Sequence, residues 1–144
     1  MQGDIGEASA IAWLAQQGAL IFTPLFRSPD YDLIAEMAGR VVRIEVKTSI
    51  SVTQVGNWLV SICTRGGNQS WNKIAKRFDR NRSDFVFAHV GKGRRWFIPA
   101  ARIEAGTVIA LGGRKYAQFE IEPGPPLPTE TEPATASTIA SPER

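Results

Sequence analysis

The sequence predicts an α/β (α+β) domain with a mixed central sheet flanked by helices. Three observations point to this class: apolar residues at helical spacing near the N-terminus, several strand-like runs with a central hairpin, and a basic segment with helical potential between strands. Its 144 residues suffice for one domain with a sizeable core and hardly for two. We therefore expect one folded unit.

The first element is a helix that begins near Asp4. Glu7 follows Asp4 at the spacing of a capping box, small and apolar residues then recur every three or four positions, and Gly18 marks the end. Two strands are expected next, over residues 19–25 and 31–36.

A turn over residues 37–40 predicts that the run 41–48 returns as the hairpin partner of 31–36. The hairpin brings Asp32 towards the face of Glu45, although the pattern does not fix the register. Further strands are predicted at 57–63, 85–90, 95–98, 107–111 and 116–121, with a basic helix at 71–80.

The composition changes at residue 123. Residues 1–122 carry sixteen Lys and Arg against eleven Asp and Glu, a net charge of +5, whereas residues 123–144 have a net charge of −2 and contain six prolines and no aromatic residue. Such a segment buries too little apolar surface to fold. We expect a domain at 1–122 and a disordered tail at 123–144.

Several classes of protein are disfavoured. No apolar run approaches the roughly 20 residues that cross a bilayer, and the N-terminus lacks the features of a signal peptide, so we expect a cytoplasmic protein. Cys63 is the only cysteine, which excludes an intramolecular disulfide and a zinc site of paired cysteines. His89, the only histidine, and Cys63 are expected to be structural.

The run 41–48 contains the most informative side chains. Because a strand has period two, Glu45 and Lys47 share one face, roughly 7 Å apart along the chain, while Val42, Ile44 and Val46 fill a core on the other. Two carboxylates, Asp32 and Glu45, can bind a hard divalent cation, and the lysine can face a phosphate. The alternative for an isolated Glu-x-Lys is an exposed charge pair.

A clustered positive charge lies between Thr64 and Arg82. Six basic residues stand there against one acid, as on a surface that binds a polyanion. A solvated helix face is the alternative interpretation. With Arg43, these residues are the predicted DNA contacts: Arg65, Lys73, Lys76, Arg77, Arg80 and Arg82.

Three motifs in order resemble the PD-(D/E)XK nuclease superfamily: Gly3-Asp4-Ile5-Gly6-Glu7, Pro29-Asp30-Tyr31-Asp32-Leu33-Ile34, and Ile44-Glu45-Val46-Lys47-Thr48. The group I intron-type endonucleases and archaeal Holliday-junction resolvases are the most similar groups. The resemblance spans residues 3–99 and implies a restriction-endonuclease-like core. The usual motif places its aspartate directly after proline, so Asp30 is an alternative to Asp32.

The resemblance also implies roles. Asp32 and Glu45 would bind Mg²⁺, or Mn²⁺ in its place, with the Val46 carbonyl as a further ligand. Lys47 would orient or activate the attacking water, and Glu7 would lie at the edge of the metal site. The expected function is Mg²⁺-dependent hydrolysis of phosphodiester bonds in duplex or branched DNA by a homodimer or larger oligomer. An inactive or partner-dependent DNA-binding module on the same fold is the alternative.

Overall fold

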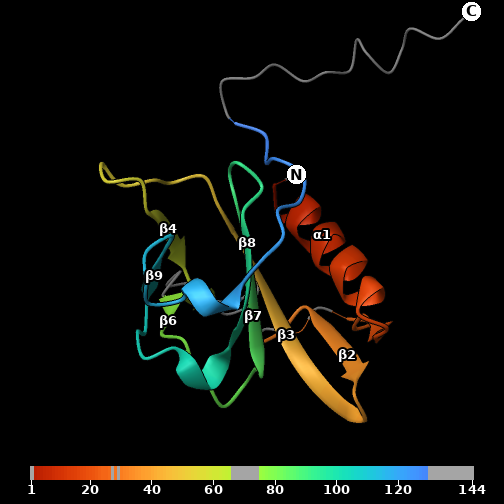
Figure 1. Ribbon diagram of the computed structural model, residues 1–144. Helices are drawn as coiled ribbons and strands as arrows, with labels where there is room; N and C mark the ends of the chain where they lie inside the picture. The colour runs from red at the N-terminus through yellow and green to blue at the C-terminus, as the bar shows by residue number, and fades with distance from the viewer. Residues whose placement is uncertain (1, 27, 29, 66–74, 130–144) are drawn as a thin grey trace, which may run out of the picture.

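A computed structural model describes residues 2–26, 28, 30–65 and 75–129. Its centre is a six-stranded sheet in the order β1-β2-β3-β7-β8-β10, in which only β3 and β7 pair in parallel. Helix α1 lies against one face (Figure 1). The predicted mixed sheet is confirmed, with one α-helix in the described ranges rather than several. The strands are β1 (Leu20–Phe22), β2 (Leu33–Met37), β3 (Arg40–Ser49), β7 (Phe85–Val90), β8 (Arg95–Pro99) and β10 (Glu120–Ile121).

Helix α1 spans Gln2–Gln16. It therefore begins before Asp4, which lies in its first turn rather than at the predicted capping position. Gly18, at φ 83°, ends the helix in the left-handed conformation that glycine favours. No helix among the described residues is long and apolar enough to span a bilayer.

The contact between α1 and β3 depends on Gly6. A Cβ atom at this position would collide with Cγ2 of Thr48 and lie 3.4 Å from Cγ1 of Val46. Further along the helix, Ala10 and Leu14 are fully buried against the apolar face of the sheet. The absence of a side chain at Gly6 thus lets the helix rest directly on the strand that carries Glu45 and Lys47.

A second, two-stranded sheet covers the other face of the central sheet. It pairs β4 (Trp58–Ser61) with β9 (Val108–Leu111) in antiparallel register. Alternate residues of both strands are buried with the central strands β7 and β8 in one core cluster. Two 3₁₀ helices, η1 (Ala100–Arg102) and η2 (Ala117–Phe119), lie between the later strands, and η2 occupies much of the strand predicted at 116–121.

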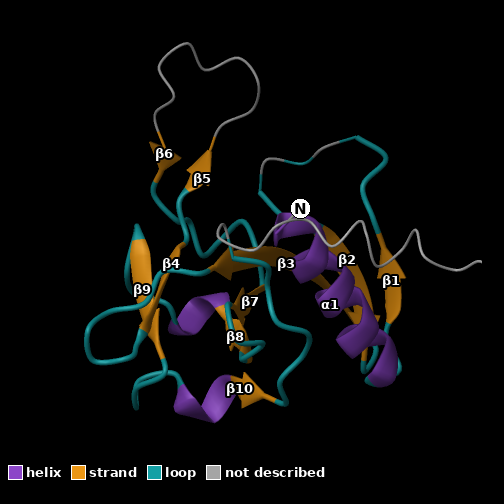
Figure 2. Ribbon diagram, turned by 90° about the horizontal axis from the view of Figure 1, so that it is seen from above, coloured by secondary structure: helices purple, strands orange, loops and turns teal. Residues whose placement is uncertain are grey.

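The predicted basic helix at 71–80 is wrong over the residues that the structure describes. A short hairpin of β5 (Thr64–Arg65) and β6 (Ala75–Lys76) stands out from the body of the molecule (Figure 2), and residues 77–79 have no regular structure. Pairing of Thr64 with Lys76 replaces the expected helical hydrogen bonds. Residues 71–74 lie outside the described residues.

The chain after β10 runs along the turn between β7 and β8, and we call residues 122–127 the C-terminal strap. Arg95 donates hydrogen bonds to the carbonyls of Glu122, at 2.9 Å, and Pro123, at 3.4 Å. Leu127 is buried, and its N–H donates to the carbonyl of Gly91 at 2.9 Å. The predicted disordered tail therefore does not begin at residue 123, whereas 130–144 lie outside the described residues.

Candidate active site

Strand β3 presents two different faces. Val42 and Ile44 are buried beneath α1, with Val46 partly buried beside them. Glu45 and Lys47 lie on the opposite face, where Nζ of Lys47 is 3.0 Å from Oε1 of Glu45. Glu45 is only 5% exposed. The period-two prediction is confirmed, and the charge pair joins a buried Glu45 to a partly buried Lys47 rather than lying exposed.

Asp32 lies immediately before β2, beside the part of the β3 backbone that carries Glu45 and Lys47. Leu33, the first residue of β2, pairs with Ile44 in the antiparallel β2–β3 hairpin. The backbone N–H of Asp32 donates to the carbonyl of Ile44 at 2.9 Å, and its Oδ2 accepts from the N–H of Val46 at 2.7 Å. The Asp32 carboxylate thus lies beside the backbone that joins Glu45 to Lys47.

The ammonium group of Lys47 has a second partner. It donates a hydrogen bond of 3.0 Å to the backbone carbonyl of Cys63, which follows β4. Two acceptors, Glu45 on β3 and the carbonyl of Cys63 between β4 and β5, therefore hold the lysine in place. The Cys63 side chain itself turns to Thr107, with Sγ 3.7 Å from that carbonyl, so the residue acts at the site through its backbone.

The pKa of Glu45 is raised above its usual value. Burial is the main cause, Lys47 acts in the opposite direction, and the negative charges of Asp32 and Asp30 raise it further. Burial and the two neighbouring acids thus disfavour the charged form of Glu45, whereas the positive charge of Lys47 favours it. Such an arrangement favours binding of an additional cation.

Glu7 lies on a different side of Asp32. Together with Thr23, Phe26 and Tyr31, the two acids line a hollow of ≈ 220 Å³ between the start of α1 and the β1–β2 connection. Glu45 does not line this hollow. Glu7 therefore lies at the edge of the site, because it shares a hollow with Asp32 but not with Glu45.

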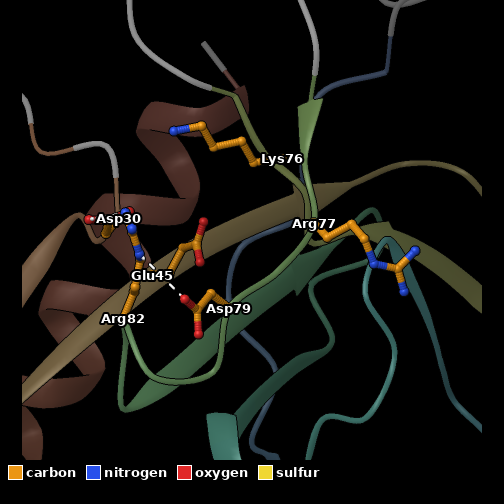
Figure 3. A pocket seen from close by; sticks show the side chains of 6 residues that line it. All are labelled: Asp30, Glu45, Lys76, Arg77, Asp79 and Arg82. Carbon is orange, nitrogen blue, oxygen red and sulfur yellow. Dashed lines mark hydrogen bonds and ion pairs between the residues drawn. The ribbon is translucent and has the colours of Figure 1, made fainter.

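A second hollow, of ≈ 130 Å³, opens beside Glu45 (Figure 3). Arg82 crosses it, with Nη1 3.2 Å from Oδ1 of Asp30 and Nε 3.4 Å from Oδ2 of Asp79. The guanidinium of Arg77 is turned away from Glu45 and lies against Gly106. The residues that line the hollow are Asp30, Glu45, Lys76, Arg77, Asp79 and Arg82.

Comparison with known proteins supports the interpretation of this geometry. Residues 1–112 match the family described as PD-(D/E)XK endonuclease. The chain belongs to the PD-(D/E)XK endonuclease family. The solved structure of a bacterial homing endonuclease, I-Ssp6803I, is similar, with a TM-score of 0.69 and 23% sequence identity over 83% of this chain and 86% of that one. No curated protein gives a significant match.

PD-(D/E)XK nucleases generally use divalent metal ions. Within the described ranges, no group of three or more His, Cys, Asp or Glu side chains could hold a metal. Two carboxylates nevertheless fit Mg²⁺, which keeps several of its waters and takes oxygen ligands. Asp32 and Glu45 supply this donor set. The N–H of Val46 is engaged by Asp32, while its carbonyl remains a predicted ligand.

The predicted DNA contacts fall into different places in this PD-(D/E)XK domain. Lys76, Arg77 and Arg82 line the hollow beside Glu45, whereas Arg80 is exposed and does not. Arg43 instead pairs with Asp84, Nε to Oδ2 at 3.2 Å, which joins β3 to the start of β7. The side chains of Arg65 and Lys73 lie outside those that the structure describes.

Sequence patterns did not identify every group at the site. Asp79 and the carbonyl of Cys63 belong to no recognisable motif, and Asp30 was predicted only as an alternative to Asp32. One signal was available for Asp30, because an acid two positions before Asp32 lies in the same connection. His89 lies away from the site and is fully buried, with Nε2 2.6 Å from the carbonyl of Pro125.

Proposed function

We propose that the protein is a Mg²⁺-dependent endonuclease that hydrolyses phosphodiester bonds in DNA. One observation carries the proposal: the carboxylate of Asp32 accepts a hydrogen bond from the N–H of Val46, the residue between Glu45 and Lys47, and the Lys47 ammonium lies 3.0 Å from Glu45. Membership of the PD-(D/E)XK endonuclease family is consistent with this chemistry.

Each residue has a definite task in this mechanism. Asp32 and Glu45 would hold the cation, with the Val46 carbonyl as a further ligand and Glu7 at the edge of the site. When bound, Mg²⁺ lowers the pKa of a water and stabilises charge on the phosphate. Lys47, held by Glu45 and the Cys63 carbonyl, orients the attacking water and neutralises charge on the phosphate.

Lys47→Ala gives the decisive variant. Purified protein is incubated with plasmid and branched DNA, with and without Mg²⁺. We expect Mg²⁺-dependent cutting that Lys47→Ala reduces by about 10²–10⁴-fold. Lys92→Ala removes an exposed lysine from the turn between β7 and β8 and serves as the matched control, with cutting unchanged.

Two outcomes contradict the proposal. Either the DNA stays intact with every substrate and metal, or Lys47→Ala cuts as fast as the wild type. DNA binding without any cutting would favour the module interpretation instead.

We further propose that the protein acts in the cytoplasm as a homodimer or larger oligomer. Cutting both strands of a duplex calls for two active sites, and one chain offers a single set of Asp32, Glu45 and Lys47. Light scattering during double-strand cleavage tests this. A monomer that makes double-strand cuts in one binding event contradicts it.

A further inference from the structure

Arg82 lies between two acids in the hollow beside Glu45. It reaches Asp30 through Nη1, at 3.2 Å and 3.4 Å from the two carboxylate oxygens, and Asp79 through Nε at 3.4 Å. Asp79 belongs to the same loop, whereas Asp30 comes from the connection before β2, 52 positions away in sequence. The ion pair between Arg82 and Asp30 therefore links two separate segments of the chain across the hollow.

The charges that face this hollow do not suit a phosphate. Asp30, Glu45 and Asp79 contribute three carboxylates, while Arg77 turns its guanidinium away and leaves Lys76 and Arg82 as the cations. Both acid partners of Arg82 must be displaced, or share it, before it can contact DNA.

We propose that Arg82 is a phosphate-binding residue and that, in the free protein, Asp30 occupies the position that the phosphate takes on Arg82. Asp30 then acts as an internal competitor of the DNA phosphate at this hollow. The inference rests on the proposed function, because it assumes that DNA approaches Glu45.

The chemistry of the guanidinium supports this exchange. Its planar fork of N–H donors fits a carboxylate and a phosphate equally well. The side chain of Arg82 is 56% exposed, and exposed ion pairs contribute little to stability because solvent screens them. Replacing Asp30 by a phosphate therefore costs little, while the preformed pair keeps Arg82 beside Glu45 until DNA arrives.

The test measures DNA binding without metal, by fluorescence anisotropy of a labelled duplex in EDTA over a series of salt concentrations. We expect Asp30→Asn to raise affinity about five- to tenfold at low salt, because Arg82 then meets a phosphate without first giving up a carboxylate partner. The slope of log affinity against log salt should steepen by up to about 0.9, because DNA binding no longer breaks a salt-sensitive ion pair.

Glu120→Gln is the matched control. It also removes one acid and frees an arginine, since Glu120 pairs with Arg94 at 2.8 Å, but on β10 at the far edge of the sheet from β1 and β2. We expect less than about a twofold change in affinity. An equal gain in Glu120→Gln and Asp30→Asn would show a general charge effect and overturn the inference.

Arg82→Gln distinguishes release of the arginine from loss of a nearby acid. In the Arg82→Gln background, Asp30→Asn should change neither the affinity nor the salt slope appreciably. A gain that persists without Arg82 overturns the inference even if the protein cuts DNA. Conversely, binding that follows the expected pattern without cutting leaves this inference intact and contradicts only the proposed nuclease activity. If the wild type neither binds nor cuts DNA, both fail.

Discussion

Oδ2 of Asp32 accepts a hydrogen bond of 2.7 Å from the backbone N–H of Val46, between Glu45 and Lys47. This contact fixes the aspartate against the centre of the proposed metal site. Asp30, two residues earlier, is bound instead to Arg82. The geometry thus separates the two acids that the sequence left as alternatives.

Asp32→Asn should abolish Mg²⁺ binding while the fold is kept. Asparagine retains an oxygen that accepts from Val46, but it lacks the charge that a hard cation needs. Calorimetric titration with millimolar Mg²⁺ gives the readout, and the melting temperature verifies folding. Asp30→Asn is the control and should keep the binding heat; loss of that heat in Asp30→Asn alone would transfer the metal site to Asp30.

Gly6→Ala should destabilise the protein although alanine favours helices. The added methyl collides with Thr48, at a cost of about 1–3 kcal/mol, which exceeds the gain of about 1 kcal/mol in helix propensity. Urea denaturation measures the free energy of unfolding. Gly3→Ala is the matched control in the same helix, because nothing lies within 4 Å of its new Cβ, and it should be stabilising. Equal effects at both positions would refute the close contact.

His89 should make the free energy of unfolding depend on pH. Burial lowers its pKa, the Pro125 carbonyl acts in the opposite direction, and Arg95 lowers it further. Nδ1 is buried without a partner, so the folded state resists protonation. The unfolded chain therefore takes up the proton first, and stability falls as pH drops below about 6.5 towards the lowered value.

The comparison with His89→Gln isolates this effect. Glutamine cannot become charged, so its free energy of unfolding should fall less between about pH 7.5 and pH 5.5 than that of the wild type, which can lose up to about 1.4 kcal/mol per pH unit. Denaturant melts at both pH values provide the measurement. Parallel losses in the two proteins would exclude His89 as the source.

Removing the C-terminal strap should destabilise the domain strongly. A chain that ends at Glu122 exposes the site of Leu127 and takes away carbonyls that hold Arg95 and His89. Leaving such groups without partners costs about 3 kcal/mol or more. A chain that ends at Thr129 should melt like the full chain. Equal melting temperatures for all three would show that the strap contributes nothing.

The central hairpin was predictable because local patterns determine it. Alternation over residues 41–48 sorted Glu45 and Lys47 from Val42 and Ile44, and the short turn indicated that β3 pairs with β2, although not in which register. These are properties of neighbouring residues, so a single sequence contains them.

The features that were missed depend on distant backbone groups. The segment at 75–76 pairs with Thr64 and Arg65 rather than forming a helix. The strap is held by hydrogen bonds from Arg95 and His89 to its backbone carbonyls. Every residue has such a carbonyl, so the sequence does not reveal these contacts, and the proline-rich composition predicted only disorder. Likewise, the acceptor that Cys63 offers to Lys47 is a carbonyl, and side-chain patterns do not reveal it.

Strand β3 uses its two faces for separate purposes, with the core on one and the acid–lysine pair on the other. A shift of this strand by a single residue would turn Glu45 into the core and Ile44 towards the proposed active site. A molecule with this misaligned strand would therefore lose both the packing of its core and the arrangement of its active-site residues. Specific activity of this protein consequently reports the fraction of chains that have folded with the correct strand alignment.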